Sequence, residues 1–124
     1  LALRLRHLLR TNTRAQARRN IAAHYDLSND FYGLWLDPSM TYSAACFDGE
    51  SGRALEDAQA AKYQRMLDLI DPRPGQHVLE VGCGWGGFAE YAARHHDLRV
   101  TGITLSPAQL AFARARMAAA GLED

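Results

Sequence analysis

Four closely spaced glycines after a short hydrophobic run constrain the fold of this chain more than any other feature. The run covers residues 78–81, and the glycines are Gly82, Gly84, Gly86 and Gly87. Residues 88–93 then have the apolar spacing of a helix. Glycine has no Cβ, so it accepts positive φ and lets backbone N–H groups approach a ligand. The pattern predicts a strand, a glycine loop and a helix, the entry unit of a nucleotide-binding α/β domain. A tight turn without a ligand is the alternative. Four glycines lose much conformational entropy on folding, however, and a simple turn does not require so many of them.

Further elements are predicted on both sides of this unit. Apolar residues at helical spacing predict a helix over residues 53–70, which residues 71–75 end with two prolines. Residues 98–103 are predicted to form a second strand. In the next helix, Ser106 is the N-cap, Pro107 lies in the first turn, Gln109 completes a capping box and Gly121 ends the helix. This alternation predicts an α/β fold with a parallel sheet and right-handed crossovers. Because two strands make a poor sheet, we expect further strands after Asp124 and a chain that is a fragment.

The first part of the chain has a different composition. Residues 1–20 hold six arginines and no acid, whereas residues 21–124 hold eight basic and fourteen acidic side chains, a net charge of −6. A basic arm of this kind is attracted to anionic lipid headgroups or to nucleic acid, and a solvated helix face is the alternative. Nucleic-acid readers add aromatic residues between the basic ones. Residues 1–20 contain none, which favours an anionic membrane surface and no nucleic acid. Ser28 is predicted to cap a short helix, and Asp37, Pro38 and Ser39 to form a turn.

The charge of Glu80 separates two possible ligands for the glycine loop. Gly82, Gly84 and Gly87 fit the G-x-G-x-x-G spacing of dinucleotide sites. Such sites place an acid at the end of the second strand, where this chain has Thr104. Glu80 would also repel a pyrophosphate and attract a cation. S-adenosylmethionine carries a sulfonium and an ammonium and no phosphate, so it is the predicted ligand. Alternatively, Glu80 is a strand-end acid bonded to a backbone N–H.

The two cysteines do not suggest a metal site. Cys46 and Cys83 lie far apart, with no second cysteine or histidine at zinc spacing. They are predicted to be reduced thiols of a cytoplasmic protein.

Four motifs in order give the chain a resemblance to a known family. Residues 78–87 resemble motif I of S-adenosylmethionine-dependent methyltransferases. With residues 24–32, 35–43 and 100–109, they make the chain similar to the cyclopropane-fatty-acyl-phospholipid synthase and mycolic acid cyclopropane synthase family over residues 20–122. The resemblance implies a Rossmann-like class I methyltransferase domain. Residues 53–124 would be its first half, and residues 1–52 a helical lid segment covering the active site.

The resemblance also implies a reaction. The methyl group of S-adenosylmethionine is transferred to a cis double bond of an unsaturated acyl phospholipid, and a base then removes a proton from that methyl to close a cyclopropane ring. In the family the base is a bound bicarbonate whose main holders lie outside this chain, so no catalytic residue is assigned. A methyl-branched lipid, methylation of another small molecule and an inactive truncated remnant stay open as alternatives. The expected location is the inner face of the membrane, with a possible homodimer at full length.

The resemblance implies three groups of residues that contact the cofactor. They are Tyr42 and Ser43; Val78, Leu79, Glu80, Val81, Gly82, Cys83, Gly84, Trp85 and Gly86; and Thr104, Leu105, Ser106, Pro107, Ala108 and Gln109. One departure from the family is Ala44, where members often have cysteine. If the backbone N–H of that cysteine serves the bicarbonate, alanine can replace it; if the thiol matters, simple methylation is favoured. His24 is expected to be structural.

Overall fold

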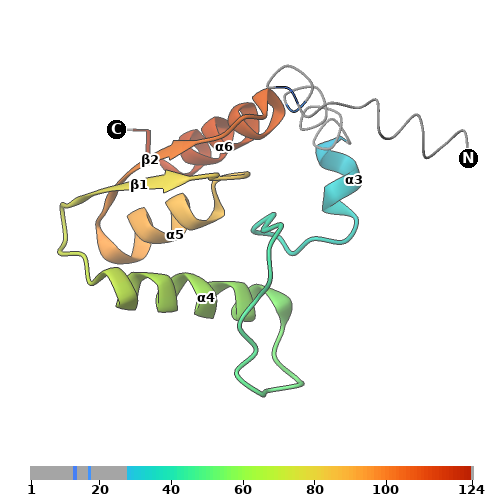
Figure 1. The fold of residues 1–124 in the computed structure, drawn as a ribbon, viewed down its shortest axis with the longest axis vertical. Helices are drawn as coiled ribbons and strands as arrows, with labels where there is room; N and C mark the ends of the chain where they lie inside the picture. The colour runs from blue at the N-terminus through green and yellow to red at the C-terminus, as the bar shows by residue number, and fades with distance from the viewer. Residues whose placement is uncertain (1–12, 14–16, 18–27, 124) are drawn as a thin grey trace, which may run out of the picture.

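The computed structural model describes residues 13, 17 and 28–123. Its elements in chain order are α3 (Asn29–Gly33), α4 (Leu55–Ile70), β1 (His77–Val81), α5 (Gly87–His96), β2 (Arg99–Ile103) and α6 (Pro107–Ala120). Figure 1 shows this alternation of helices and strands, which confirms the predicted α/β class. The basic arm, residues 1–20, and His24 lie outside the described residues, apart from Thr13 and Ala17.

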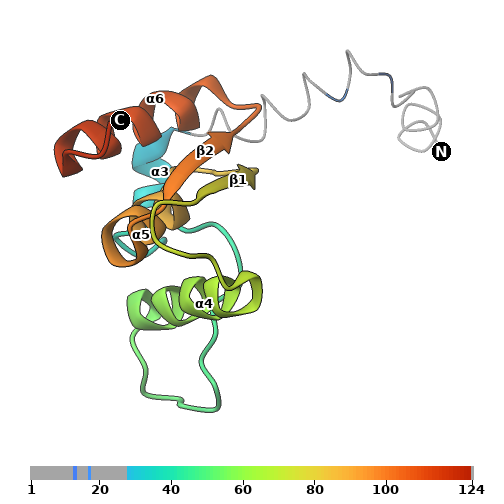
Figure 2. The same ribbon diagram turned by 90° about the vertical axis from the view of Figure 1, so that its left-hand side faces the viewer.

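The two strands pair in parallel, as the predicted crossover requires. In their register Val78 lies opposite Val100, and Glu80 opposite Gly102. Helix α5 connects the strands and contacts β2, and it also contacts α4 and α6. Both views place α5 between the other two helices (Figures 1 and 2). The glycine loop therefore begins where β1 ends and leads directly into α5, the helix between α4 and α6.

The main core lies between α4, α5 and the sheet. It consists of Tyr63, Leu67, Phe88, Ala92 and Leu98, with Val78, Tyr91 and Val100 packed against it. The buried face of α4 is Ala58, Gln59, Tyr63 and Leu67. The apolar spacing that predicts this helix also runs through Leu55, Met66 and Leu69, but these side chains are exposed. The spacing of apolar residues does not distinguish a helix face that packs in the core from one that lines a cleft. Met66 lies on a face that lines the cleft.

The helix ends follow the predicted local chemistry with one change. Ser28 Oγ accepts from Phe31 N at 3.3 Å, Ser106 Oγ accepts from Gln109 N at 3.2 Å, and Gly121 ends α6 at φ 68°. The second half of the capping box was wrong. The Gln109 side chain accepts from Thr104 Oγ1 at 2.8 Å, and Ser106 N donates to the same hydroxyl at 3.2 Å. Thr104 thus replaces the reciprocal contact and ties the end of β2 to the start of α6.

None of the helices within residues 28–123 has the length and hydrophobicity to cross a bilayer.

Candidate functional site

A cleft of about 670 Å³ opens beyond the carboxyl ends of β1 and β2, between the glycine loop, α4 and residues 40–43. Most of the predicted cofactor residues line it together. They are Tyr42, Ser43, Val78, Leu79, Glu80, Val81, Gly82, Cys83, Gly84, Trp85, Thr104, Leu105, Ser106 and Gln109. Gly86, Pro107 and Ala108 do not line the cleft. Ala44 is exposed outside the lining, and Cys46 is half-buried with its N–H donating to Ala58 O at 3.0 Å.

Glu80 is the most unusual group in the cleft. Its Oε2 atom is buried without a hydrogen-bond partner, so the alternative of a strand-end acid satisfied by backbone is not supported at that atom. Burial raises the pKa of the Glu80 carboxyl to about 7, and the Lys62 ammonium opposes that rise. A buried acceptor without a partner costs free energy that a bound donor can recover. A cationic ligand that donates a hydrogen bond to Glu80 Oε2 would therefore be stabilised in this cleft.

The glycine loop is shaped by its own hydrogen bonds. Gly82 N and Cys83 N both donate to the Ile103 carbonyl, at 2.9 and 3.0 Å, and Gly86 N donates to Cys83 O at 2.9 Å. These amides are therefore occupied within the protein and do not form a cradle of free donors for phosphate. Gly82 and Gly84 adopt φ of 85° and 53° with open space where a Cβ would stand. The loop thus offers room for an apolar or cationic group close to the backbone.

Two other glycines serve close packing. A Cβ on Gly87 would come within 2.6 Å of the Tyr63 hydroxyl. That hydroxyl also shares a short hydrogen bond with Thr41 Oγ1, so the start of α5, the middle of α4 and residue 41 meet at one point. A Cβ on Gly102 would lie 2.8 Å from Cys83 Cβ. Larger residues at either position would push the glycine loop away from β2 or α4.

Residues 37–43 are held against the cleft by a network of polar contacts. Asp37, which is buried, accepts from Ser39 N at 3.0 Å and from Thr41 N at 3.3 Å, and this confirms the predicted turn. Met40 has a φ of 55°, a conformation that a residue with a side chain keeps only under strong constraint. Gln59 of α4 donates to Ser43 O at 2.9 Å. Tyr42 and Ser43 are therefore presented at the cleft by a fixed turn.

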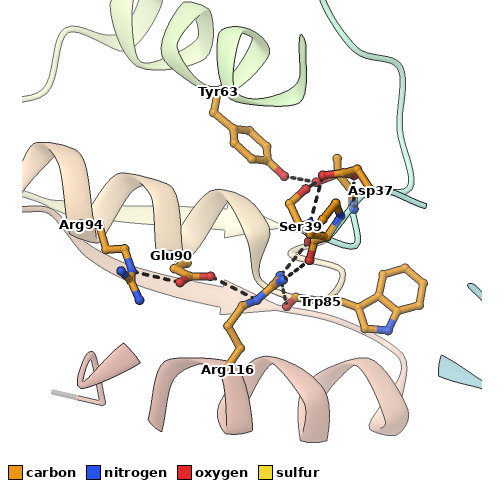
Figure 3. A network of polar contacts seen from close by, with 9 residues as sticks. Asp37, Ser39, Tyr63, Trp85, Glu90, Arg94 and Arg116 are labelled. Carbon is orange, nitrogen blue, oxygen red and sulfur yellow. Dashed lines mark hydrogen bonds and ion pairs between the residues drawn. The ribbon is translucent and has the colours of Figure 1, made fainter. Parts of the chain in front are cut away.

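Arg116 connects this turn with the glycine loop (Figure 3). From α6 its guanidinium donates to Ser39 O at 2.7 Å, Pro38 O at 3.1 Å and Trp85 O at 3.0 Å. Its Nε lies 3.2 Å from a carboxylate oxygen of Glu90, and the Arg116 side chain is only 12% exposed. A planar guanidinium with five donors suits three carbonyls and one carboxylate at once. Arg116 is thus a clamp between three segments that are distant in sequence.

Aromatic side chains join the short helix α3 to the glycine loop. The ring centroid of Tyr32 lies 4.9 Å from that of Trp85 and 5.4 Å from that of Tyr42. Trp85 Nε1 donates to Asn29 Oδ1 at 2.8 Å. With Tyr32 and Met40, Trp85 forms a second small core. Residues 28–43 therefore pack beside the loop; that residues 1–52 cover an active site stays a prediction.

Several lining residues were not predicted from the sequence. They include Lys62, Tyr63, Met66 and Ile70 of α4, together with Met40, Thr41, Gly87 and Phe88. Helix α4 precedes the glycine unit, and its apolar pattern indicated only a core helix. One signal was present: Lys62 is the only lysine in the chain, among thirteen arginines.

The residues present fit S-adenosylmethionine on observations of this structure. Glu80 supplies a buried anionic acceptor at the foot of the cleft, the glycine loop leaves open space, and the Thr104 and Gln109 side chains add polar groups at the end of β2. A pyrophosphate fits less well because it would face the Glu80 charge.

Comparisons with known proteins agree with this geometry. The family model described as mycolic acid cyclopropane synthetase matches residues 12–124. A probable fatty acid methyltransferase of Pseudomonas putida is 48% identical over 104 residues, which is 84% of this chain and 26% of that protein. Cyclopropane mycolic acid synthase 2 of Mycobacterium tuberculosis (strain CDC 1551 / Oshkosh) is 46% identical over 95 residues, 77% of this chain and 31% of that protein.

Solved structures give the same result. The cyclopropane synthase MmaA2 from Mycobacterium tuberculosis superposes with a TM-score of 0.77 at 40% identity, and mycolic acid cyclopropane synthase CmaA1 complexed with SAH and CTAB with 0.77 at 42%. Each match covers 82% of this chain and 35% of the solved chain, so this chain spans about a third of the length of its relatives. Coclaurine N-methyltransferase, 24% identical with a TM-score of 0.73, shares the fold. The chain belongs to the mycolic acid cyclopropane synthetase family.

Proposed function

We propose that this chain forms the S-adenosylmethionine-binding part of a methyltransferase that modifies unsaturated acyl chains of lipids. The observation that carries the proposal is the unpartnered Glu80 carboxylate oxygen buried beside an open glycine loop. When bound, S-adenosylmethionine supplies an electrophilic methyl group on a sulfonium. A cleft with an anionic acceptor, in which the amides of Gly82, Cys83 and Gly86 are already bonded within the protein, is suited to that charge and less suited to a pyrophosphate.

Different residues of the cleft contact different parts of such a ligand. Glu80 accepts hydrogen bonds from the ammonium of the methionine portion. Gly82 and Gly84 leave space for the chain of the ligand to pass close to the backbone. Thr104 and Gln109, already bonded to each other at 2.8 Å, form a polar rim for the ribose and adenine. Tyr42 closes the cleft from the side of residues 40–43.

The lipid substrate is supported by the names of the relatives. One is named a probable fatty acid methyltransferase and another a cyclopropane mycolic acid synthase, so a lipid acyl chain is the shared class. We add the double bond because a cyclopropane is formed by adding one carbon across an alkene. Formation of a cyclopropane is our first choice of product, with bicarbonate as base, held mainly by residues that this chain does not contain. If ring closure needs the thiol of the family's cysteine, Ala44 favours the second choice, a methyl-branched product. We place the protein on the cytoplasmic face of an anionic membrane, as a homodimer at full length.

The choice of cofactor is tested by calorimetry on the full-length protein. S-adenosylmethionine and S-adenosylhomocysteine are expected to bind with dissociation constants in the micromolar range, about −8 kcal/mol. NAD is expected to bind at least ~100-fold more weakly, because its pyrophosphate meets Glu80. Adenosine is the control for binding through the base and ribose alone. Tighter binding of NAD than of S-adenosylmethionine would refute the proposed cofactor.

Mass spectrometry of membrane lipids tests the substrate class. Cells expressing the full gene are expected to gain lipids heavier by one methylene group per modified acyl chain, at the expense of chains with a cis double bond. Ozonolysis of the same lipids then separates rings, which survive it, from methylene branches, which are cleaved. A saturated methyl branch is heavier by two further hydrogens, because its formation also consumes a reductant, so its mass identifies it. A gene with Glu80→Gln is the matched control. Unchanged lipids in cells that contain the soluble, cofactor-binding protein would exclude a lipid substrate while leaving the cofactor assignment intact.

A further inference from the structure

A single lysine lies on the wall of the cleft. The chain has thirteen arginines and one lysine, and that lysine, Lys62 of α4, lines the same cleft as Glu80. Its ammonium is partly buried, which lowers its pKa, while Asp37, Cys46 and Glu80 act in the opposite direction. A positive charge kept partly out of water beside a site for a cationic ligand is unfavourable unless it also meets an anion.

The position of the ammonium is set by two hydrogen-bond partners and by the Tyr63 ring, whose centroid lies 5.0 Å from Lys62 Nζ. Lys62 Nζ donates to Ser43 Oγ at 2.7 Å and to Gln59 Oε1 at 2.6 Å. Gln59 is 2% exposed and donates in turn to Ser43 O at 2.9 Å. An ammonium has three N–H donors, so these bonds leave one for a group in the cleft. The protein therefore orients the Lys62 ammonium with two of its three N–H groups, and the third can donate to a ligand.

Lys62 and Glu80 stand apart within one cleft. Each influences the pKa of the other, yet among the ion pairs of residues 28–123 none joins them. A cation and an anion on the wall of one cleft, close enough to interact and not paired, complement a ligand that carries both charges. The amino-acid end of S-adenosylmethionine is such a group, with an ammonium and a carboxylate on one carbon.

We infer that Lys62 binds the carboxylate of the methionine portion of the cofactor, opposite the ammonium held by Glu80. The inference rests on the proposed function and adds a specificity to it, because the cleft then distinguishes ligands with an intact amino-acid end from those without a carboxylate. Ser43 and Gln59 are positioning residues for the Lys62 ammonium. A lysine side chain suits this task because its compact charge can bond one carboxylate oxygen while two donors stay on the protein.

The test compares three ligands on the full-length protein by calorimetry. They are S-adenosylhomocysteine, decarboxylated S-adenosylmethionine, which keeps the ammonium, and 5′-methylthioadenosine, which lacks the whole amino-acid end. Lys62→Met is expected to weaken S-adenosylhomocysteine roughly 10- to 100-fold, the usual range for a lost charged hydrogen bond. It is expected to leave 5′-methylthioadenosine within about 3-fold, and decarboxylated S-adenosylmethionine unchanged or tighter, because a like charge is removed. Lys62→Arg should recover part of the loss.

Arg65→Met is the matched control, since it removes one positive charge from the same helix. The Arg65 side chain is 70% exposed, lies 3.9 Å from the Asp48 carboxylate and does not line the cleft, so no ligand should bind differently. Equal weakening of all three ligands by Lys62→Met would mean that Lys62 only braces Ser43 and Gln59, and would overturn the inference. Lys62→Gln, read in the same way, replaces Lys62→Met if that variant does not fold. Failure of the wild-type protein to bind any of the three would instead overturn the proposed function itself.

Discussion

Replacing Arg116 with methionine is expected to lower the free energy of unfolding by about 2–4 kcal/mol and to weaken cofactor binding in the protein that remains folded. The substitution keeps a long side chain but removes three hydrogen bonds to carbonyls and the contact with Glu90. A side chain that is 12% exposed is largely shielded from water, so the carbonyls it leaves are only partly rehydrated. Breaking a partly buried charge pair by deleting one partner adds to the cost.

The second effect follows from where these carbonyls lie. Pro38 and Ser39 belong to the turn that presents residues 42 and 43, and Trp85 belongs to the glycine loop. Without the clamp, both segments lose the same restraint, so binding of S-adenosylhomocysteine should weaken by about 10-fold or more at a temperature well below the melting transition.

The matched control for this prediction is Arg114→Met. Arg114 lies on the exposed side of the same helix, α6, so the change in net charge and helix propensity is the same. Chemical denaturation and calorimetry give the two quantities. Arg116→Lys should be intermediate, because an ammonium cannot reach four acceptors in the plane of a guanidinium. Equal stability and equal cofactor affinity of Arg114→Met and Arg116→Met would show that the clamp has no role.

Cofactor affinity is expected to rise with pH between about 5.5 and 7.5, through the ionisation of Glu80. Burial raises the pKa of Glu80 from 4.5 to about 7, so the free carboxyl is largely protonated at the lower end of this range and largely ionised at the upper end. Only the ionised form attracts the ammonium and sulfonium of the ligand. Binding should therefore release about half a proton per site at pH 7. Calorimetry in buffers of different ionisation enthalpy measures this number directly.

Glu80→Gln isolates the contribution of this carboxyl. The ligand ammonium titrates in both proteins, and so do the groups that interact with Glu80, namely Lys62, Tyr63 and Cys83. The difference between wild type and variant thus belongs to Glu80. The variant should bind S-adenosylmethionine roughly 10- to 100-fold more weakly at pH 7.5, with no proton release near pH 7. Proton release that survives the substitution would assign the raised pKa to another group.

The same ionisation affects stability in the absence of ligand. A carboxyl whose pKa is raised on folding stabilises the folded state while it is protonated. That stabilisation is lost as pH rises from the ordinary value of 4.5 through about 7. The ligand-free protein should accordingly become less stable across this range, and the ligand should restore more stability at the higher pH.

Local chemistry allowed much of this fold to be predicted from the sequence. Ser28, Ser106 and Gly121 mark helix ends by interactions within a few residues, and the glycines after β1 mark a turn that few other residues accept. The boundary of α4 was less accurate. The helix begins at Leu55 without a side-chain cap, because Arg53 bonds back to Cys46 O and Asp48 instead.

The parts of the site that escaped prediction depend on contacts between distant segments. No motif in the sequence singles out Arg116, and nothing near it in sequence indicates that three carbonyls lie within its reach. Lys62 and Tyr63 lie within the stretch whose apolar spacing predicts only a helix. Their roles emerge only when α4 packs beside residues 41–43, which requires the turn at Asp37 and the loop that leads to α4.

The Arg116 clamp also has a consequence for synthesis on the ribosome. It closes on Ser39 across 77 positions of the chain, and Trp85 bonds Asn29 across 56. Contacts of such separation form late, since the entropy of closing the loop precedes any gain. While α6 is still in the exit tunnel, the nascent chain can form α4, β1 and α5 but cannot fasten the turn that presents Tyr42 and Ser43. Fixing Tyr42 and Ser43 at the cleft therefore has to wait until α6 has emerged.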